Sequence, residues 1–206
     1  MSPNNATVRL VSKQHFDINR PIHLARRDVF FERAVELLYV PLQNLSTADR
    51  IKSSDVILSM LKTAETHAFF AIQSSGTVAQ ESDFLRFLRL ISDNVKSAHA
   101  MMQHQLHLEA EESFLCQFLN ATPEQCVLPA MHYQRRAEDI LQGLWNVLQL
   151  AHTAYRSLQA SNLQKLTEDE RARYRKAYDS FRHDATTRYT VPGMNKEQAA
   201  SQTQQG

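Results

Sequence analysis

Glycine is scarce in this sequence, and its scarcity excludes several kinds of site. The chain has four glycines among 206 residues, where globular proteins average about 7%. Tight hairpins, dinucleotide-binding turns, P-loops and nucleophile elbows need glycine at defined places. No two of the four glycines lie close enough together to build such a loop. We therefore expect a non-enzymatic protein.

Cysteine, net charge and long apolar runs are equally limited. Two cysteines, Cys116 and Cys126, are too few for a disulfide framework, and a net charge of +1 gives no global attraction to nucleic acid or an anionic membrane. No apolar run approaches the roughly 20 residues of a membrane span. The N-terminus lacks the basic-then-apolar pattern of a secretory signal. These absences predict a cytoplasmic protein without a membrane span.

What the sequence does contain is helical periodicity. The chain is 43% hydrophobic and 22% charged, which is ordinary for a folded protein. Apolar residues recur at three- and four-residue steps, and capping residues and prolines bound the periodic stretches. Thr167-Glu168-Asp169-Glu170 is a capping box that opens the last of these stretches. Helices are predicted at about 19–40, 54–74, 83–119, 129–160 and 167–185. The pattern predicts an all-α antiparallel bundle of about five helices.

The stretch 83–119 is the longest predicted helix and would be central to the bundle. Its first half keeps a 3.5-residue seam, whereas its second half steps by four, so the apolar stripe drifts around the axis. Either the helix breaks near 104–109, or its halves face different partners. The second alternative implies more apolar surface than a lone bundle buries.

The two ends of the chain differ from the bundle. Residues 1–16 are polar, and Thr7–Val11 alternates like a short strand, which predicts an extended N-terminal arm. Residues 17–190 would form the bundle domain. Beyond Pro192 the sequence is polar and rich in glutamine, so residues 191–206 are predicted to be a disordered tail.

Histidines make the densest set of potential metal ligands. His104, His107 and Glu111 could share one face of a helix. Neither His-Glu-x-x-His nor a paired Glu-x-x-His motif occurs. A solvated polar face is therefore favoured over a metal site, and no metal or cofactor is predicted.

The last predicted helix interleaves basic and aromatic residues. Tyr174, Tyr178 and Phe181 form one stripe among arginines such as Arg171 and Arg175. In one interpretation the stripe packs on the bundle. In the other, the helix binds an acidic protein or a nucleic-acid backbone. Nearby acidic residues dilute the field and favour a protein.

Large apolar residues elsewhere are either core or partner contacts. Trp145 is flanked at helical spacing by leucines, and adaptable methionines occur at promiscuous binding surfaces. The candidate partner-binding residues are Met101, Met102, Leu106, Phe114, Trp145, Arg171, Arg175, Tyr174 and Tyr178.

A small helical chain without a chemical motif is similar in general look to the adaptor subunits of bacterial secretion machines, although no motif carries the likeness. We expect an adaptor or chaperone-like subunit that binds a partner helix within a larger assembly, such as a hetero-oligomer. The alternatives are nucleic-acid binding through the last helix and an enzyme whose site is assembled from separated helices.

Overall fold

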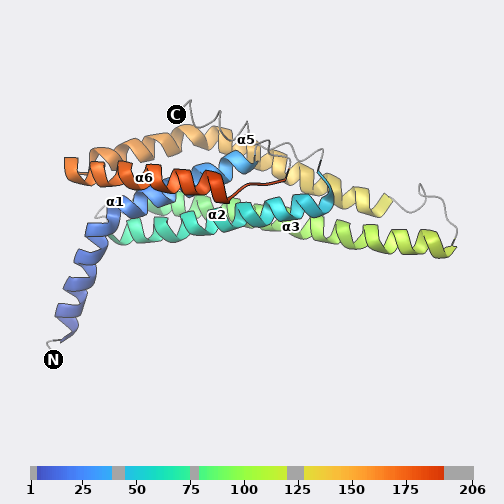
Figure 1. Cartoon of the computed structure of the whole chain (residues 1–206), viewed down its shortest axis with the longest axis horizontal. Helices are drawn as coiled ribbons and strands as arrows, with labels where there is room; N and C mark the ends of the chain where they lie inside the picture. Colours follow the sequence, from blue (N-terminus) through green and yellow to red (C-terminus); the bar gives the residue numbers. More distant parts are fainter. Residues whose placement is uncertain (1–3, 39–44, 75–78, 120–127, 193–206) are drawn as a thin grey trace. The chain divides into compact units, whose positions relative to one another are not determined.

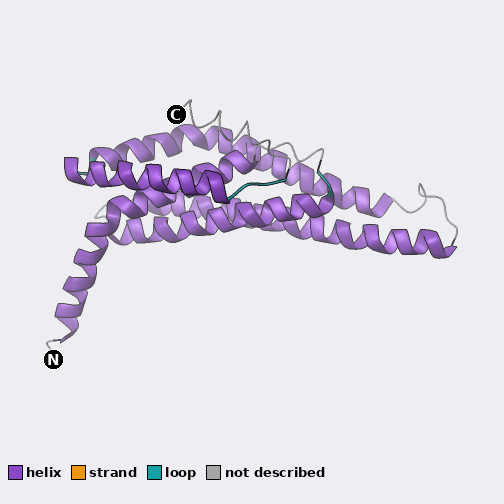
Figure 2. Ribbon diagram, viewed as in Figure 1, coloured by secondary structure: helices purple, strands orange, loops and turns teal. Residues whose placement is uncertain are grey.

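A computed structural model describes residues 4–38, 45–74, 79–119 and 128–192. The described residues form helices and short loops and include no strand, so the all-α bundle class is confirmed for them (Figures 1 and 2). The helices are α1 (Asn4–Leu38), α2 (Thr47–Ser74), α3 (Ala79–Leu119), α5 (Leu128–Gln164) and α6 (Glu168–Arg188). The count of about five helices and the central position of the long one stay predictions.

The N-terminal region differs from the expectation. α1 begins at Asn4, so the extended arm predicted for residues 1–16 is wrong over its helical part, and Pro21 lies inside the helix instead of at its start. A lone strand has no neighbour for its backbone hydrogen bonds, whereas a helix satisfies them locally. The alternation at Thr7–Val11 therefore carries no strand.

Two helices begin earlier than predicted. The Ser46 hydroxyl accepts a hydrogen bond from the backbone N–H of Asp49, so α2 starts at Thr47 and not near residue 54. α3 starts at Ala79, which places Glu81 in its first turn and not in a linker. Acidic residues in a first turn stabilise the positive end of the helix dipole.

The predicted capping box at the start of α6 is confirmed. The backbone N–H of Thr167 donates to the Glu170 carboxylate at 2.8 Å, and the N–H of Glu170 donates to the Thr167 hydroxyl at 3.3 Å. This reciprocal pair satisfies two amide donors that the helix cannot use itself. α6 continues to Arg188.

α3 is continuous from Ala79 to Leu119, so of the two alternatives for this helix the break near 104–109 does not occur. The seam predicted for its first half is its buried stripe, from Phe84 to Met102.

At the C-terminal end of the chain, Val191 is 5% exposed, and residues 193–206 of the predicted tail lie outside the described residues.

Contacts divide the chain into two compact units, each built from several segments. Unit 1 comprises Met1–Arg33, Met60–Leu90 and Leu150–Arg188, and unit 2 comprises Ala34–Ser59, Ile91–Gln149 and Tyr189–Gly206. The single bundle domain at 17–190 stays a prediction.

Unit 1 has two apolar centres. One joins α1, α2 and α6 through five buried residues, which are Leu24, Ala25, Ala71, Leu166 and Tyr174. The other is aromatic: Phe31 of α1 meets the edge of Phe84 of α3 at 5.2 Å between ring centroids and lies 4.8 Å from Tyr155 of α5. Edge-to-face and tilted pairs are the favoured geometry for rings.

Unit 2 has a smaller apolar cluster around Ala98 and Met102 of α3 and Ala137 of α5. Beside it, the buried Gln105 amide donates to Thr47 at 3.0 Å and to Glu109 at 2.7 Å. These bonds satisfy polar groups that would be costly to bury alone. None of the described helices carries an apolar stretch long enough to traverse a bilayer.

Candidate partner-binding pocket

A pocket of about 440 Å³ opens between α3 and α5 within unit 1. Its walls come from one turn of α3 and about two turns of α5. The lining residues are Asp83, Phe84, Phe87, Ala154, Tyr155, Ser157, Leu158 and Ser161. Small-molecule and side-chain pockets of roughly 300–1,000 Å³ with mainly apolar walls and few polar groups are typical binding sites.

The aromatic walls of the pocket are held in place from behind. Tyr155 stacks on Phe84 with ring centroids 5.6 Å apart, and its hydroxyl donates to Glu32 of α1 at 2.8 Å. Phe87 lies 6.4 Å from Phe84 between centroids. A wall that is already packed and hydrogen-bonded loses little freedom when a ligand arrives.

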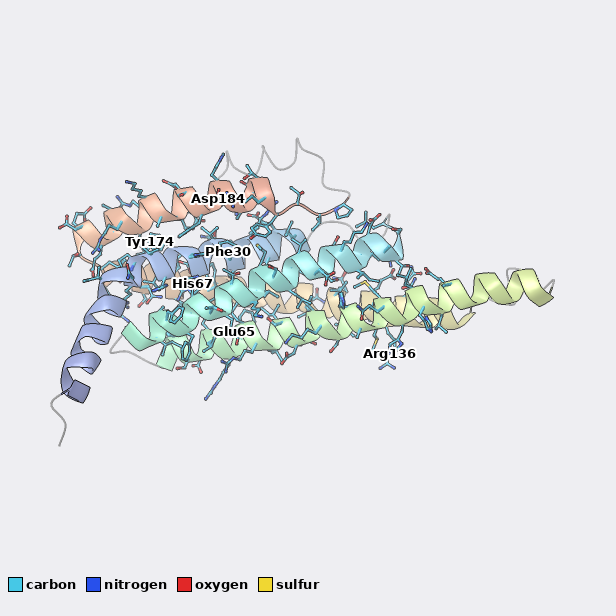
Figure 3. The ribbon with its side chains drawn as sticks, turned by 60° about the horizontal axis from the view of Figure 1, so that its bottom comes forward. Phe30, Glu65, His67, Arg136, Tyr174 and Asp184 are labelled. Atoms are coloured by element: carbon cyan, nitrogen blue, oxygen red, sulfur yellow. The ribbon has the colours of Figure 1, made fainter. Side chains whose placement is uncertain are left out.

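A buried polar network lies behind these walls. Three helices each contribute residues four apart: Asp28 and Glu32 on α1, Tyr155 and Gln159 on α5, and Tyr174 and Tyr178 on α6. Tyr174 donates to Asp28 at 2.8 Å, and Tyr178 donates to Glu32. Gln159 also donates to the Tyr174 hydroxyl at 3.2 Å. Figure 3 labels Tyr174 where α6 faces α1.

The phenols of this network stay protonated. Burial raises the pKa of Tyr155, and the nearby Asp28 and Glu32 carboxylates raise it further. Burial is the largest cause that raises the pKa of Tyr174, and the Asp28 carboxylate raises it further. For Tyr178, burial again raises the pKa most, and the Glu32 carboxylate is the second cause. These tyrosines therefore act as hydrogen-bond donors and not as bases at neutral pH.

Arg27 is the charged centre of the network. Its guanidinium is fully buried and bonds to Asp28 at 2.8 Å and to Glu81 of α3 at 2.7 Å. Burial alone would lower the pKa of Arg27, but the Asp28 and Glu81 carboxylates outweigh it and raise the pKa above its ordinary value. The network thus ties α1 to α3 and α6 through hydrogen bonds between buried side chains.

Two histidines make a second polar contact in unit 1. Nδ1 of His23 lies 2.9 Å from Nδ1 of His67, and the ring centroids are 5.2 Å apart. The two nitrogens therefore lie near the line between the rings, as an N–H···N hydrogen bond requires. Burial lowers the pKa of His67 to about 4, with smaller contributions from Arg26 and His23.

This histidine contact predicts acid sensitivity. The pKa of His67 is near 6.5 when the chain is unfolded and about 4 in the fold, so the unfolded chain binds the proton more readily. His67 therefore makes its full contribution to the free energy of unfolding above pH 6.5. As the pH falls towards 4 this contribution is lost, by about 1–2 kcal/mol after allowance for partial exposure. Urea unfolding at several pH values measures it. His67→Asn should flatten that slope and the exposed His183→Asn should not; equal slopes in both variants would refute the assignment.

The structure places the predicted site residues in different surroundings. Met102 is 1% exposed and belongs to the core cluster of unit 2, Met101 is half-buried against that cluster, and Leu106 is 41% exposed. The side chains of Phe114, Trp145, Glu111 and Cys116 lie outside the described ones, as does Cys126. The predicted stripe on α3 is thus core at Met102 and surface at Leu106.

On α6 the packing interpretation matches the structure. Tyr174 and Tyr178 stack at 5.9 Å and pack in the core of unit 1. Arg175 is exposed, and Arg171 pairs with Glu168 at 2.9 Å. The exposed face of α6 therefore carries charges of both signs.

Two histidines of the candidate metal-ligand set lie on the surface of α3. His104 and His107 are exposed. Across the described side chains, no group of three or more histidine, cysteine or acidic residues is placed to hold a metal ion.

The sequence did not reveal every residue of the pocket or of the buried network. Helical periodicity puts Phe84, Tyr155 and Leu158 on apolar seams. It does not single out Phe87, an aromatic residue off the α3 seam that signals a second contact surface. Arg27 also went unnoticed, because only its contact with Glu81, 54 residues away, shows that it is buried.

Comparison with protein-family models, with curated proteins and with solved structures finds no match to this chain.

Proposed function

We propose that this chain is a non-enzymatic helical adaptor or chaperone-like protein that binds a partner helix. The observation that carries the proposal is the aromatic pocket between α3 and α5. A partner helix docks by placing large apolar side chains into such a groove, where a few buried anchors supply most of the binding energy. Membership of a larger assembly, such as a secretion-type machine, belongs to the same proposal.

The length of the pocket along α5 fits a helix as the ligand. The lining residues Ala154, Leu158 and Ser161 recur at four- and three-residue steps along α5, a span of about 10 Å at 1.5 Å per residue. On a partner helix, two anchoring side chains one or two turns apart are separated by a similar distance. The pocket holds no buried nucleophile or base that would point to catalysis instead.

The proposal is tested by filling the pocket. Helical peptides selected on the full chain should bind through a large apolar anchor, and Ala154→Trp should weaken them at least about tenfold because the new ring occupies the anchor position. Ala160→Trp is the matched control: it changes another exposed alanine of α5 that does not line the pocket. Calorimetry measures both.

Two results would contradict the proposal. One is that no helical peptide is enriched. The other is that the enriched peptides bind the Ala154→Trp and Ala160→Trp variants equally, which would place the binding surface elsewhere on the chain.

A further inference from the structure

We infer that the partner helix is basic, and that it seats an aromatic side chain in the α3–α5 pocket with a lysine or arginine beside Asp83. The inference rests on the proposed function and adds the chemistry of the partner. It follows from three features of the lining: the rings of its walls, the charge at its rim, and two hydroxyl groups on α5.

The walls favour an aromatic anchor. Phe84, Phe87 and Tyr155 present three rings from two helices, with Phe84 and Tyr155 stacked at an interplanar angle of 28°. Rings attract rings through edge-to-face and offset contacts in addition to the burial of apolar area. Because Tyr155 is fixed by Glu32, this surface is ready before the partner arrives.

The lining includes one acidic side chain. Asp83 is the one charged residue of the lining, and its side chain is 75% exposed. Its neighbour Arg86 lies 3.8 Å away and is 82% exposed, and an ion pair so solvated contributes little. The Asp83 carboxylate is therefore available to a cation on a docked helix, and a carboxylate at that place would be repelled.

The hydroxyls of Ser157 and Ser161 add polar contacts on the α5 side. Several helix hydroxyls in the described part of the chain donate back to a backbone carbonyl, as those of Ser53, Thr66 and Ser97 do. The same part of the structure gives Ser157 and Ser161 no such bond, although both line the pocket. They can accept hydrogen bonds from an indole N–H or an ammonium group.

The inference is tested with two small probes that differ in charge. Tryptamine carries an aromatic ring and an ammonium group, and indole-3-propionate carries the same ring and a carboxylate. Methyl NMR titration of the full chain should give tryptamine a dissociation constant of about 1–10 mM, as expected for fragments. Indole-3-propionate should bind at least about fivefold more weakly.

Asp83→Asn should remove the difference between the probes while leaving binding of the ring. Asp93→Asn is the matched control, because Asp93 is an exposed residue of α3 that pairs with Lys96 three residues on, as Asp83 does with Arg86. Asp93→Asn should leave the preference for tryptamine unchanged. Ala154→Trp should abolish binding of both probes.

The outcomes separate this inference from the proposed function. Equal binding of the two probes, lost in Ala154→Trp, would overturn the basic partner and leave the pocket as the anchor site. A preference for tryptamine that survives Asp83→Asn would also overturn it. Absence of binding by either probe at about 10 mM would overturn the aromatic anchor, and the peptide selection would then judge the adaptor role by itself.

Discussion

An Arg27→Met variant is expected to unfold with a free energy about 3–5 kcal/mol below that of the unchanged chain, the largest loss we expect from any single substitution. Arg27 is 0% exposed, and its guanidinium is the one described side chain that bonds to Glu81. Removing it leaves two buried carboxylates, Asp28 and Glu81, without a counter-charge. Urea unfolding followed by circular dichroism measures the loss.

Two further variants identify the cause. Arg89→Met breaks a surface pair, Arg89 with Glu65 at 2.7 Å, and should cost at most about 1 kcal/mol (Glu65 is labelled in Figure 3). Adding Glu81→Leu to Arg27→Met should restore part of the lost stability, because it removes one uncompensated charge. If Arg27→Met costs no more than Arg89→Met, the buried network does not hold unit 1 together.

Met102→Ala is expected to lower the free energy of unfolding by about 2–5 kcal/mol, since it opens a cavity in the core of unit 2. Met102 is 1% exposed and packs with Ala98 and Ala137. The neighbouring Met101 is only half-buried, so Met101→Ala should cost clearly less. Thermal unfolding of both variants checks the prediction.

This pair of methionines also tests the earlier hypothesis of a partner-binding stripe. A residue that contacts a partner loses binding on truncation and leaves stability nearly unchanged. A Met102→Ala variant as stable as the unchanged chain would therefore contradict the placement of Met102 in the core. It would instead favour the hypothesis that Met102 is a partner-binding residue.

Local signals in the sequence predicted much of the fold. The capping box of Thr167 and Glu170 forms as expected, and the seam from Phe84 to Met102 is buried, because capping and periodicity act within a few residues of chain. The start of α1 was missed because alternating residues in Thr7–Val11 suit a strand only where a neighbouring strand exists.

The candidate site was predicted less well, since it depends on contacts between distant parts of the chain. Tyr155 and Phe84 were recognisable as apolar seam residues, but their stacking joins α3 and α5. Tyr174 was expected either at a partner surface or packed on the bundle. Its hydrogen bond to Asp28, 146 residues away, favours the packed position. Nothing local in Arg26-Arg27-Asp28 distinguishes a buried arginine from an exposed one.

The pocket and the buried network are physically connected through Tyr155. Its ring lines the pocket, and its hydroxyl bonds to Glu32, which also accepts a hydrogen bond from Tyr178 of α6. The rigidity of the docking surface thus depends on how the carboxylates of α1 hold the aromatic residues of α5 and α6. In the proposed adaptor role, a surface preformed in this way would lose little freedom when a partner binds.

Methyl NMR of the full chain tests most directly whether a partner side chain enters the pocket between α3 and α5. On addition of a selected helical peptide, the methyl groups of Ala154 and Leu158 should shift strongly through the ring of the anchor, while that of Ala160 should stay nearly unchanged. Peptide binding that leaves the Ala154 and Leu158 signals in place would contradict the account.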